Sequence, residues 1–251
     1  MTKVVACIIS RLNSTRLPQK SIMDVCGKPM VVRLYDRLSR CVSIDMTAIV
    51  TSSLVSDDPL EDISLRHGIP CYRGSLDNVM ERISGAADVF KADVIVEILG
   101  DNPLVDPSTV DQTVTLMRKE GWDYCATLTT EYSQSSGVKE VFPLGVRVQA
   151  YSNEVAKKYK HYPNYIRTEK HPSAYIYDNP DHFKCGFLRS SDDWKTPKFT
   201  ALNLSVNYSK NLDFVREVFK FFGEQEFELE DIDSWLSNHL EMRELLGSDD
   251  I

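Results

Sequence analysis

Four short runs rich in valine and isoleucine, in the first half of the chain, constrain its fold more than any other feature. The runs are Val4–Ser10, Thr47–Thr51, Ile69–Arg73 and Val94–Leu99. Apolar runs of this length are typical of parallel strands that are covered on both faces of a sheet. Amphipathic segments separate the runs, and this alternation predicts an α/β domain with a doubly wound, mostly parallel sheet.

The ends of two connecting helices can be predicted from local signals. Asp58 stands directly before a proline and is expected to be the N-cap of a helix that Gly68 ends. Asp106 also precedes a proline and is expected to begin a second helix, which Gly121 ends.

The second half of the chain alternates less regularly. A polar stretch, 131–142, is expected to form a loop or hairpin, and 162–181 is expected to be partly helical. The other expected elements are strands at Tyr124–Thr130, Gly145–Tyr151 and Phe199–Val206, and helices at Ser152–Tyr159, Asn211–Phe222 and Ile232–Leu246. In the helix that begins at Asn211, the side chains expected to face inward are Leu212, Val215, Val218, Phe221 and Phe222.

Bulk properties exclude several classes of protein. The 251 residues fit a single domain, 1–251, with an insertion or dimerisation region expected near 131–181. The formal charge of −8 argues against non-specific nucleic-acid binding. No apolar run approaches the roughly 20 residues that cross a bilayer, and no signal peptide is recognised.

The cysteines point to a reducing compartment. Cys7, Cys71 and Cys125 fall in apolar, strand-like runs, as small buried hydrophobic residues do. There is no Cys-x-x-Cys pair, and histidines and cysteines are scattered, so a zinc site is not expected. We therefore expect a cytoplasmic protein without membrane or nucleic-acid partners.

A basic segment follows the first predicted strand. Within it lie four cations and three hydroxyl or amide side chains: Arg11, Arg16, Lys20, Lys28, Asn13, Ser14 and Thr15. Arginine offers a planar fork of donors to phosphate oxygens, and lysine offers a compact positive charge. The segment therefore suits a polyanion such as a triphosphate; a solvated basic loop is the alternative.

The spacing of this segment resembles a known family. Arg-x-x-Ser-Thr-Arg-Leu-Pro-x-Lys, followed by Asp-x-x-Gly-Lys-Pro-Met, is similar to the nucleotide loop of cytidylyltransferases that activate acidic sugars. These are the 3-deoxy-manno-octulosonate cytidylyltransferases and the spore coat polysaccharide biosynthesis protein F group. The resemblance implies a Rossmann-like, GT-A-like nucleotidyltransferase fold, with CTP bound by the loop and its transition state stabilised by Arg16 and Lys20.

A second motif begins with Gly100 and Asp101, directly after the fourth apolar run. Ligands of open α/β sheets bind beyond the carboxyl ends of strands, so Asp101 should meet the basic loop there and could hold Mg²⁺. The segment resembles the family's Gly-Asp-x-Pro-Leu-x-Asp motif, whose first Asp holds the metal and whose Gly adjoins the nucleotide. The alternative is a helix-capping turn, which is the favoured interpretation for Asp106. The family's second metal-binding Asp corresponds to Asn207, whose amide oxygen brings no charge.

A third motif resembles the family's Arg-Gly-Ser-x-Asp-Asp-Val segment. The resemblance implies that five of its residues lie beside the nucleotide: Arg73, Gly74, Ser75, Asp77 and Asn78. A helix N-terminus there would also offer backbone N–H groups to an anion. Plain capping of that helix by Ser75 or Asp77 is the alternative.

Other positions depart from the family pattern. Arg147 and Gln149 replace two acids of a Gly-x-Asp-x-Glu segment, where Arg147 would suit an anionic acceptor or simply face solvent. His171 matches a family Glu-His-Val-Thr segment and either contacts the acceptor or is structural. Leu99 stands where some relatives carry a Gln that helps to read the pyrimidine.

The resemblance implies an enzyme that transfers CMP from CTP to an acidic 2-keto-3-deoxy sugar, such as an octulosonate or nonulosonate, and releases pyrophosphate. It also implies Mg²⁺ on Asp101 and Asn207, a homodimer, and a role in surface polysaccharide biosynthesis. Two alternatives stay open: another acceptor such as a phosphonate, and a nucleotide-binding relative without turnover, which Asn207 motivates. A dehydrogenase is disfavoured because no Gly-x-Gly-x-x-Gly follows the first strand.

Overall fold

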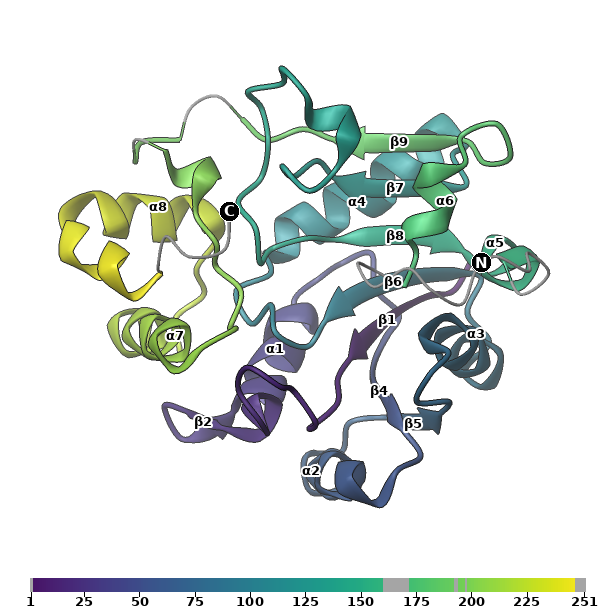
Figure 1. Cartoon of the computed structure of the whole chain (residues 1–251), viewed down its shortest axis with the longest axis horizontal. Coiled ribbons are helices and arrows are strands. Elements are labelled where there is room, and N and C mark those ends of the chain that lie inside the picture. The colour runs from purple at the N-terminus through teal and green to yellow at the C-terminus, as the bar shows by residue number, and fades with distance from the viewer. Residues whose placement is uncertain (1, 160–171, 192–193, 197, 247–251) are drawn as a thin grey trace.

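The computed structural model describes residues 2–159, 172–191, 194–196 and 198–246, and it contains a central sheet of seven strands (Figure 1). The strands stand in the order β5-β4-β1-β6-β8-β7-β9. Their bounds are β1 (Val4–Ile9), β4 (Met46–Ser52), β5 (Cys71–Gly74), β6 (Val94–Leu99), β7 (Tyr124–Thr127), β8 (Gln149–Ser152) and β9 (Cys185–Leu188). A separate two-stranded ribbon pairs β2 (Asp24–Val25) with β3 (Lys28–Pro29).

The sheet is mostly parallel, as predicted. β1 pairs in parallel with β4 and β6, and β4 pairs in parallel with β5. The four apolar runs of the first half are therefore four neighbouring strands. β8 runs antiparallel to both β6 and β7, while β9 is parallel to β7.

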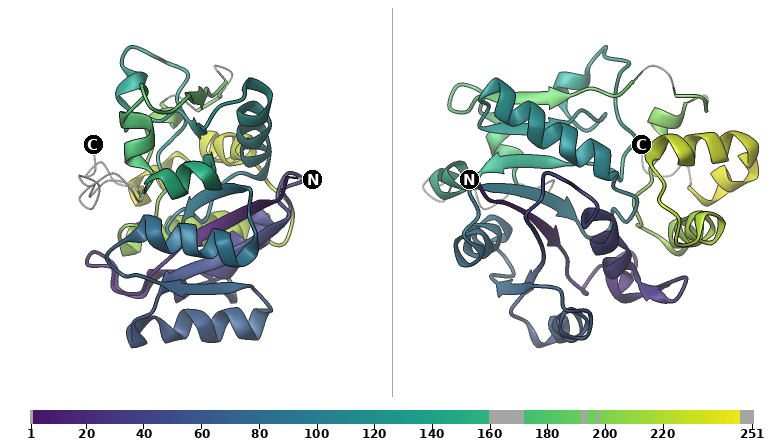
Figure 2. Two further views of the ribbon diagram at one scale, coloured as in Figure 1. Left: turned by 90° about the vertical axis from the view of Figure 1, so that its right-hand side faces the viewer. Right: turned by 180° about the vertical axis from the view of Figure 1, so that it is seen from behind.

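Helices cover both faces of the sheet, so the predicted doubly wound arrangement is confirmed (Figure 2). The helices of one face are α1 (Met30–Leu38), α2 (Asp58–His67) and α4 (Pro107–Glu120), whose apolar sides share a buried cluster with β1 and β6. The helices of the other face are α3 (Val79–Phe90), α5 (Asn153–Tyr159) and α6 (Ala174–Asp178). Burial on both faces explains why the strands lack a polar side.

The last two long helices form a third apolar cluster with α1 and the β2–β3 ribbon. They are α7 (Ser209–Phe222) and α8 (Leu229–Asn238), and they lie at the side of the sheet toward which β1 and β6 point (Figure 1). The short 3-10 helices are η1 (Lys20–Ile22), η2 (Val55–Asp57), η3 (Ser133–Ser135), η4 (Phe199–Ala201) and η5 (Leu240–Leu245). None of the described helices combines the length and apolarity needed to cross a bilayer.

Most helix ends follow the sequence signals. Gly68 and Gly121 end α2 and α4 with φ of 65° and 64°, a conformation that glycine adopts readily. Asp106 caps α4 by accepting a 2.9 Å hydrogen bond from the N–H of Thr109. The expectation that Asp58 is an N-cap is wrong, because Asp58 is the first helical residue and Asp57 precedes the helix.

Three predictions in the C-terminal part are also wrong. The segment 199–206 begins as η4, and among the described residues its strand pairing is limited to one bridge between Leu144 and Asn203, so the expected strand does not form. The final helix ends at Asn238 and continues as η5, so one long helix does not form. Phe221 was expected to face inward, but it is 59 % exposed and packs on Trp235 from outside.

Candidate active site

The ends of β1 and β6 approach closely and bring two predicted motifs together. The backbone N–H of Gly100 donates a 2.8 Å hydrogen bond to the carbonyl of Ile9. A Cβ on Gly100 would lie 2.9 Å from the Cβ of Ser10, so only glycine permits this contact. The basic loop after β1 and Asp101 after β6 therefore share one edge of the sheet, as the topology predicts.

Three contacts hold the basic loop, residues 11–20, in shape. Asp57 accepts a 2.8 Å hydrogen bond from the N–H of Leu12, and Leu12 accepts one of 2.9 Å from the N–H of Gln19. Ser10 and Ser21, at the two ends of the loop, are joined by a 2.7 Å hydrogen bond. The loop is therefore an ordered turn whose cations have defined positions.

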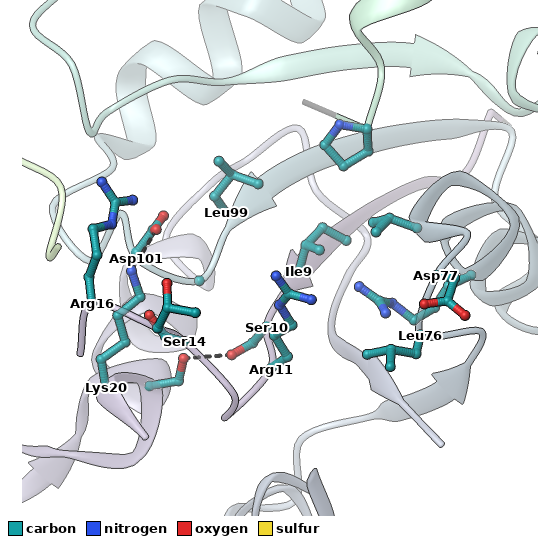
Figure 3. A pocket seen from close by; sticks show the side chains of 16 residues that line it. Ile9, Ser10, Arg11, Ser14, Arg16, Lys20, Leu76, Asp77, Leu99 and Asp101 are labelled. Atoms are coloured by element: carbon teal, nitrogen blue, oxygen red, sulfur yellow. Dashed lines mark hydrogen bonds and ion pairs between the residues drawn. The ribbon is translucent and has the colours of Figure 1, made fainter. Parts of the chain in front are cut away.

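A cavity of about 460 Å³, the first cavity, opens over this loop (Figure 3). In Figure 3, Arg16, Lys20 and Asp101 lie on one side, Leu76 and Asp77 on the other. Eight of the sequence-predicted residues line it: Arg11, Ser14, Thr15, Arg16, Lys20, Asp77, Gly100 and Asp101. Its volume is in the range of small-molecule sites.

Lys20 and Asp101 contact each other directly. The Lys20 ammonium lies 2.8 Å from Oδ2 of Asp101 and donates a 2.7 Å hydrogen bond to the carbonyl of Val206. Lys20 is only 8 % exposed, so water screens this charge weakly. The contact joins three distant segments, from the first loop to the C-terminal part of the chain.

A second cavity, of about 390 Å³, adjoins the first. Arg16, Leu99 and Asp101 line both cavities. The remaining walls of the second cavity are rich in amide and hydroxyl groups, and consist of Asn102, Glu131, Leu144, Gly145, Arg147, Asn203, Ser205 and Asn207. Such walls suit a small ligand with several hydroxyl groups.

Arg147 contributes a buried cation to the second cavity. It is 3 % exposed, and its Nη1 lies 2.9 Å from Oε2 of Glu131. Burial alone would lower the pKa of Arg147, but Tyr132 and Glu131 raise it above its ordinary value. The guanidinium therefore stays charged, and an anionic ligand would compete with Glu131 for it.

Asp101 and Asn207 fit a magnesium ion by the chemistry of their oxygens. The N–H of Val206 donates a 2.8 Å hydrogen bond to the carbonyl of Asp101, which keeps Asn207 beside Asp101. Oδ1 of Asn207 is buried and has no hydrogen-bond partner among the described residues, while Nδ2 donates to Ser205 at 2.9 Å. Within the described part of the chain, no group of three or more His, Cys, Asp or Glu side chains could hold a metal. Mg²⁺ at a nucleotide site needs fewer, because phosphate oxygens and water complete its shell.

Other predicted residues lie away from both cavities. Arg73 faces α2, where it lies 2.6 Å from Asp58 and 2.7 Å from Glu61. The side chain of Asn78 caps α3 through a 2.9 Å hydrogen bond from the N–H of Glu81, so the N-cap is neither Ser75 nor Asp77, the two residues of the capping alternative. The residues that line neither cavity are Asn13, Arg73, Gly74, Ser75, Asn78 and Gln149. His171 lies outside the described residues.

Gln149 belongs to a buried polar network behind the second cavity. Its Oε1 accepts hydrogen bonds from the hydroxyls of Tyr124 and Ser173, at 3.1 and 2.9 Å. Its Nε2 donates a 2.8 Å hydrogen bond to Glu97, which also accepts one of 2.9 Å from Tyr151. Burial raises the pKa of the Glu97 carboxyl. The network pins β6 to β8 next to the strand end that carries Asp101.

The sequence analysis missed several lining residues. Arg82 could have been found, because it lies one helical turn after Asn78, the N-cap of α3. Asn203 and Ser205 could not, because they reach the second cavity only through the pairing of their segment with Leu144.

Fold and site together define a class. A mostly parallel, doubly wound sheet carries an ordered basic loop, an acidic residue at the adjacent strand end and two adjoining cavities. This is the arrangement of a nucleotidyltransferase, which joins a nucleotide to a second substrate.

Comparisons with known proteins identify the family. A family model described as cytidylyltransferase matches residues 5–192, so the chain belongs to the cytidylyltransferase family and is a nucleotidyltransferase enzyme. The spore coat polysaccharide biosynthesis protein SpsF of Bacillus subtilis is 24 % identical, over 90 % of both chains. A 3-deoxy-manno-octulosonate cytidylyltransferase of Chloroherpeton thalassium is 35 % identical, over half of each chain.

Solved structures show the same fold. A cytidylyltransferase from Leptospira borgpetersenii superposes with a TM-score of 0.84 at 21 % identity, over 100 % of this chain and 99 % of that one. A CMP:2-keto-3-deoxy-manno-octonic acid synthetase complexed with CTP superposes with a TM-score of 0.62 at 17 % identity, over 88 % and 99 %. The resemblance inferred from the sequence motifs is confirmed.

Proposed function

We propose that the enzyme transfers CMP from CTP to a small acidic sugar of the 2-keto-3-deoxy class and releases pyrophosphate. One observation carries the proposal: the two cavities meet at Arg16, Leu99 and Asp101. CTP bound in the first cavity would therefore present its α-phosphate to an acceptor in the second. Family membership supports the choice of CTP.

In the proposed reaction, a hydroxyl oxygen of the acceptor attacks the α-phosphorus of CTP. The bond from the α-phosphorus to the bridging oxygen breaks, pyrophosphate leaves with the electron pair, and the hydroxyl proton passes to water. Arg11, Arg16 and Lys20 hold the phosphates and oppose the charge that develops on them. Asp101 keeps Lys20 in place through their 2.8 Å contact.

We propose that Asp101 and Asn207 would hold Mg²⁺ with the phosphates. Lys20 contacts Oδ2 of Asp101, which leaves Oδ1 for a metal ion, and Oδ1 of Asn207 has no partner in the part of the chain that the structure describes. A bound magnesium ion would neutralise phosphate charge and favour departure of pyrophosphate. Asn207 brings no charge, so weaker magnesium binding than at two carboxylates is expected.

The acceptor would lie between the amide-rich walls of the second cavity and Arg147. Amide and hydroxyl side chains there suit the hydroxyl groups of a sugar, and the guanidinium suits a carboxylate. A phosphonate would satisfy the same guanidinium and is the second candidate acceptor. The proposal extends to a single domain, a homodimer formed through 131–181, a cytoplasmic location and surface polysaccharide biosynthesis, for which the family resemblance is the support.

A pyrophosphate-release screen tests the proposal. Four nucleoside triphosphates are combined with sugar acids and with phosphonates, with and without Mg²⁺. We expect release only with CTP, a sugar acid and Mg²⁺. Absence of release with every sugar acid, together with release for a phosphonate, would reassign the acceptor.

Two variants locate the chemistry. Lys20→Ala and Asp101→Asn should each slow pyrophosphate release roughly 10²–10³-fold, as loss of one charge-stabilising group does. Asp36→Asn is the matched control, because Asp36 forms an ion pair of the same 2.8 Å length with Lys28 and lines neither cavity. Turnover of Asp101→Asn close to that of Asp36→Asn would contradict the assignment.

Arg147→Met should raise the acceptor KM and leave the KM for CTP unchanged.

A further inference from the structure

Arg82, on the first turns of α3, is a buried cation at the wall of the first cavity. It is 2 % exposed. Among the described residues, its only hydrogen bond runs from Nη1 to the carbonyl of Ser75, at 2.8 Å, and its buried Nε has no partner. A guanidinium has five N–H donors, and leaving them unused in a buried place costs free energy. Within the described part of the chain, the hydrogen bonds of Arg82 are therefore incomplete.

The charge around Arg82 is also unbalanced. Burial, and then the positive charge of Arg11, lowers the pKa of Arg82 to about 10, while Asp57 acts in the opposite direction. Arg82 thus stays protonated at neutral pH, but no carboxylate of the described chain forms an ion pair with it. A ligand that presents hydrogen-bond acceptors would complete this part of the cavity.

The position of Arg82 indicates which part of a nucleotide it meets. Lys20 and Asp101, where the phosphates are expected, lie on the far side of the first cavity from Leu76 and Asp77 (Figure 3). Asp77 directly precedes the N-cap of α3, and Arg82 lies in the first turn of that helix, so both belong to the same end of the cavity wall. The Asp77 carboxylate on this side of the cavity would repel a phosphate group, whereas a neutral base tolerates it.

The walls on this side suit a flat ring. Ile9, Leu76 and Val79 supply apolar surface to the first cavity. Leu99, which also lines the cavity, has no hydrogen-bonding group in its side chain. Arg82 supplies donors and Asp77 supplies acceptors within the same cavity. This is the complement of a base edge that carries both acceptors and a donor.

We propose that Arg82 and Asp77 recognise the cytosine ring of CTP and are the residues that select it over uracil. Arg82 donates to O2 and N3 of the base, and Asp77 accepts from the N4 amino group. Uracil has an N–H at N3 and a carbonyl at C4. Its N3–H would face the donors of Arg82 and its O4 would face the Asp77 carboxylate, and both contacts are unfavourable. The same logic underlies arginine and carboxylate recognition of base edges in nucleic acids. The inference rests on the proposed use of CTP and specifies how this chain reads the base although position 99 is leucine.

Titration calorimetry of the whole chain with CTP and with UTP tests the assignment. The wild-type chain should prefer CTP. Arg82→Met should weaken CTP binding about tenfold to a hundredfold, the usual value of a bidentate base contact, and UTP binding much less. Asp77→Asn should narrow the preference by strengthening UTP binding, since an amide can donate to O4.

Two further variants separate base recognition from phosphate binding. Lys20→Met should weaken CTP and UTP by the same factor, because both carry the triphosphate and Lys20 lies on the far side of the cavity from Asp77. Arg82→Lys keeps the charge but loses the planar fork, so it should still lose the preference for CTP; it also serves if Arg82→Met fails to fold.

Equal weakening of CTP and UTP by both Arg82 variants would assign Arg82 to the phosphates and overturn the inference. An unchanged preference in Arg82→Lys and Asp77→Asn would overturn it as well. A wild-type chain that binds neither nucleotide would instead refute the proposed function, so the two failures are distinguishable.

Discussion

Replacing Gly145 by alanine should disrupt the wall of the second cavity. Gly145 has a φ of +84°, and a Cβ there would lie 2.0 Å from the backbone nitrogen of Ser205 and 2.4 Å from the carbonyl carbon of Leu204. Both contacts are to backbone, which cannot rotate away as a side chain can. The segment 144–145 and the segment 203–205 must therefore separate.

The magnitude follows from three terms. An alanine held at positive φ costs roughly 1–2 kcal/mol. Separation also endangers two backbone hydrogen bonds, from Leu144 to Leu202 at 3.0 Å and from Leu204 to Leu144 at 2.8 Å. Each contributes about 0.5–1.5 kcal/mol, so the total loss is about 2–5 kcal/mol. For a chain of this size, this should lower the Tm by roughly 10 °C.

Gly121→Ala is the matched control. Gly121 has a φ of +64°, but nothing lies within 4 Å of its Cβ position. It should lose only the conformational term, about 1–2 kcal/mol, and a few degrees in Tm. Differential scanning calorimetry measures both variants, and the acceptor KM should rise for Gly145→Ala alone. Equal losses of stability in the two variants would refute the steric argument.

Three further outcomes are expected. Burial raises the pKa of the Glu97 carboxyl, so the folded chain binds this proton more tightly than the unfolded chain. The resulting stabilisation of the folded state is present below about pH 4.5 and is lost as pH rises through the folded pKa. Glu97→Gln should therefore gain stability relative to wild type with rising pH, by about 1.4 kcal/mol per unit of pKa shift, in urea titrations at several pH values. Asp106→Ala should cost about 3–5 kcal/mol in the same assay, because it removes the cap of α4 and the carboxylate 4.0 Å from buried Arg37, whereas Asp106→Asn should spare the cap. Arg73→Met should lower the Tm through loss of its ion pair with Glu61 but leave the KM for CTP unchanged; a raised KM would return Arg73 to the nucleotide site.

The strands of the first half were predictable because each is a local pattern. β6 runs from Val94 to Leu99, as the apolar run does, and its neighbours differ from prediction by a residue or two at their ends. Covered on both faces, these strands need no polar side, and so the apolar run coincides with the element. The cap at Asp106 was predictable for the same reason, since its donors lie within three residues.

The prediction of the N-cap failed at α2, where a distant segment takes part. The proline after Asp58 correctly located the helix, but Asp57 is the residue that precedes it. The side chain of Asp57 accepts a hydrogen bond from the N–H of Leu12, which lies 45 residues away. Likewise, Arg73 was predicted beside the nucleotide, and the structure places it against Glu61 of α2. No local signal distinguishes a carboxylate that caps its own helix from one that braces a distant loop.

The sequence by itself determined the class of this protein: a phosphate-binding loop after the first strand and an acidic residue after β6, in the spacing of the cytidylyltransferases. These are short-range patterns, and parallel strands with right-handed crossovers bring their ends to one edge whatever the remaining details. Only the tertiary structure decided that Lys20 lies between Asp101 and the carbonyl of Val206, 186 residues away. It alone also decided that, among the described residues, Arg82 in the wall of the first cavity and Oδ1 of Asn207 in the wall of the second keep hydrogen-bonding capacity without a protein partner. Such contacts depend on how separate segments pack, and this is a property of the whole fold.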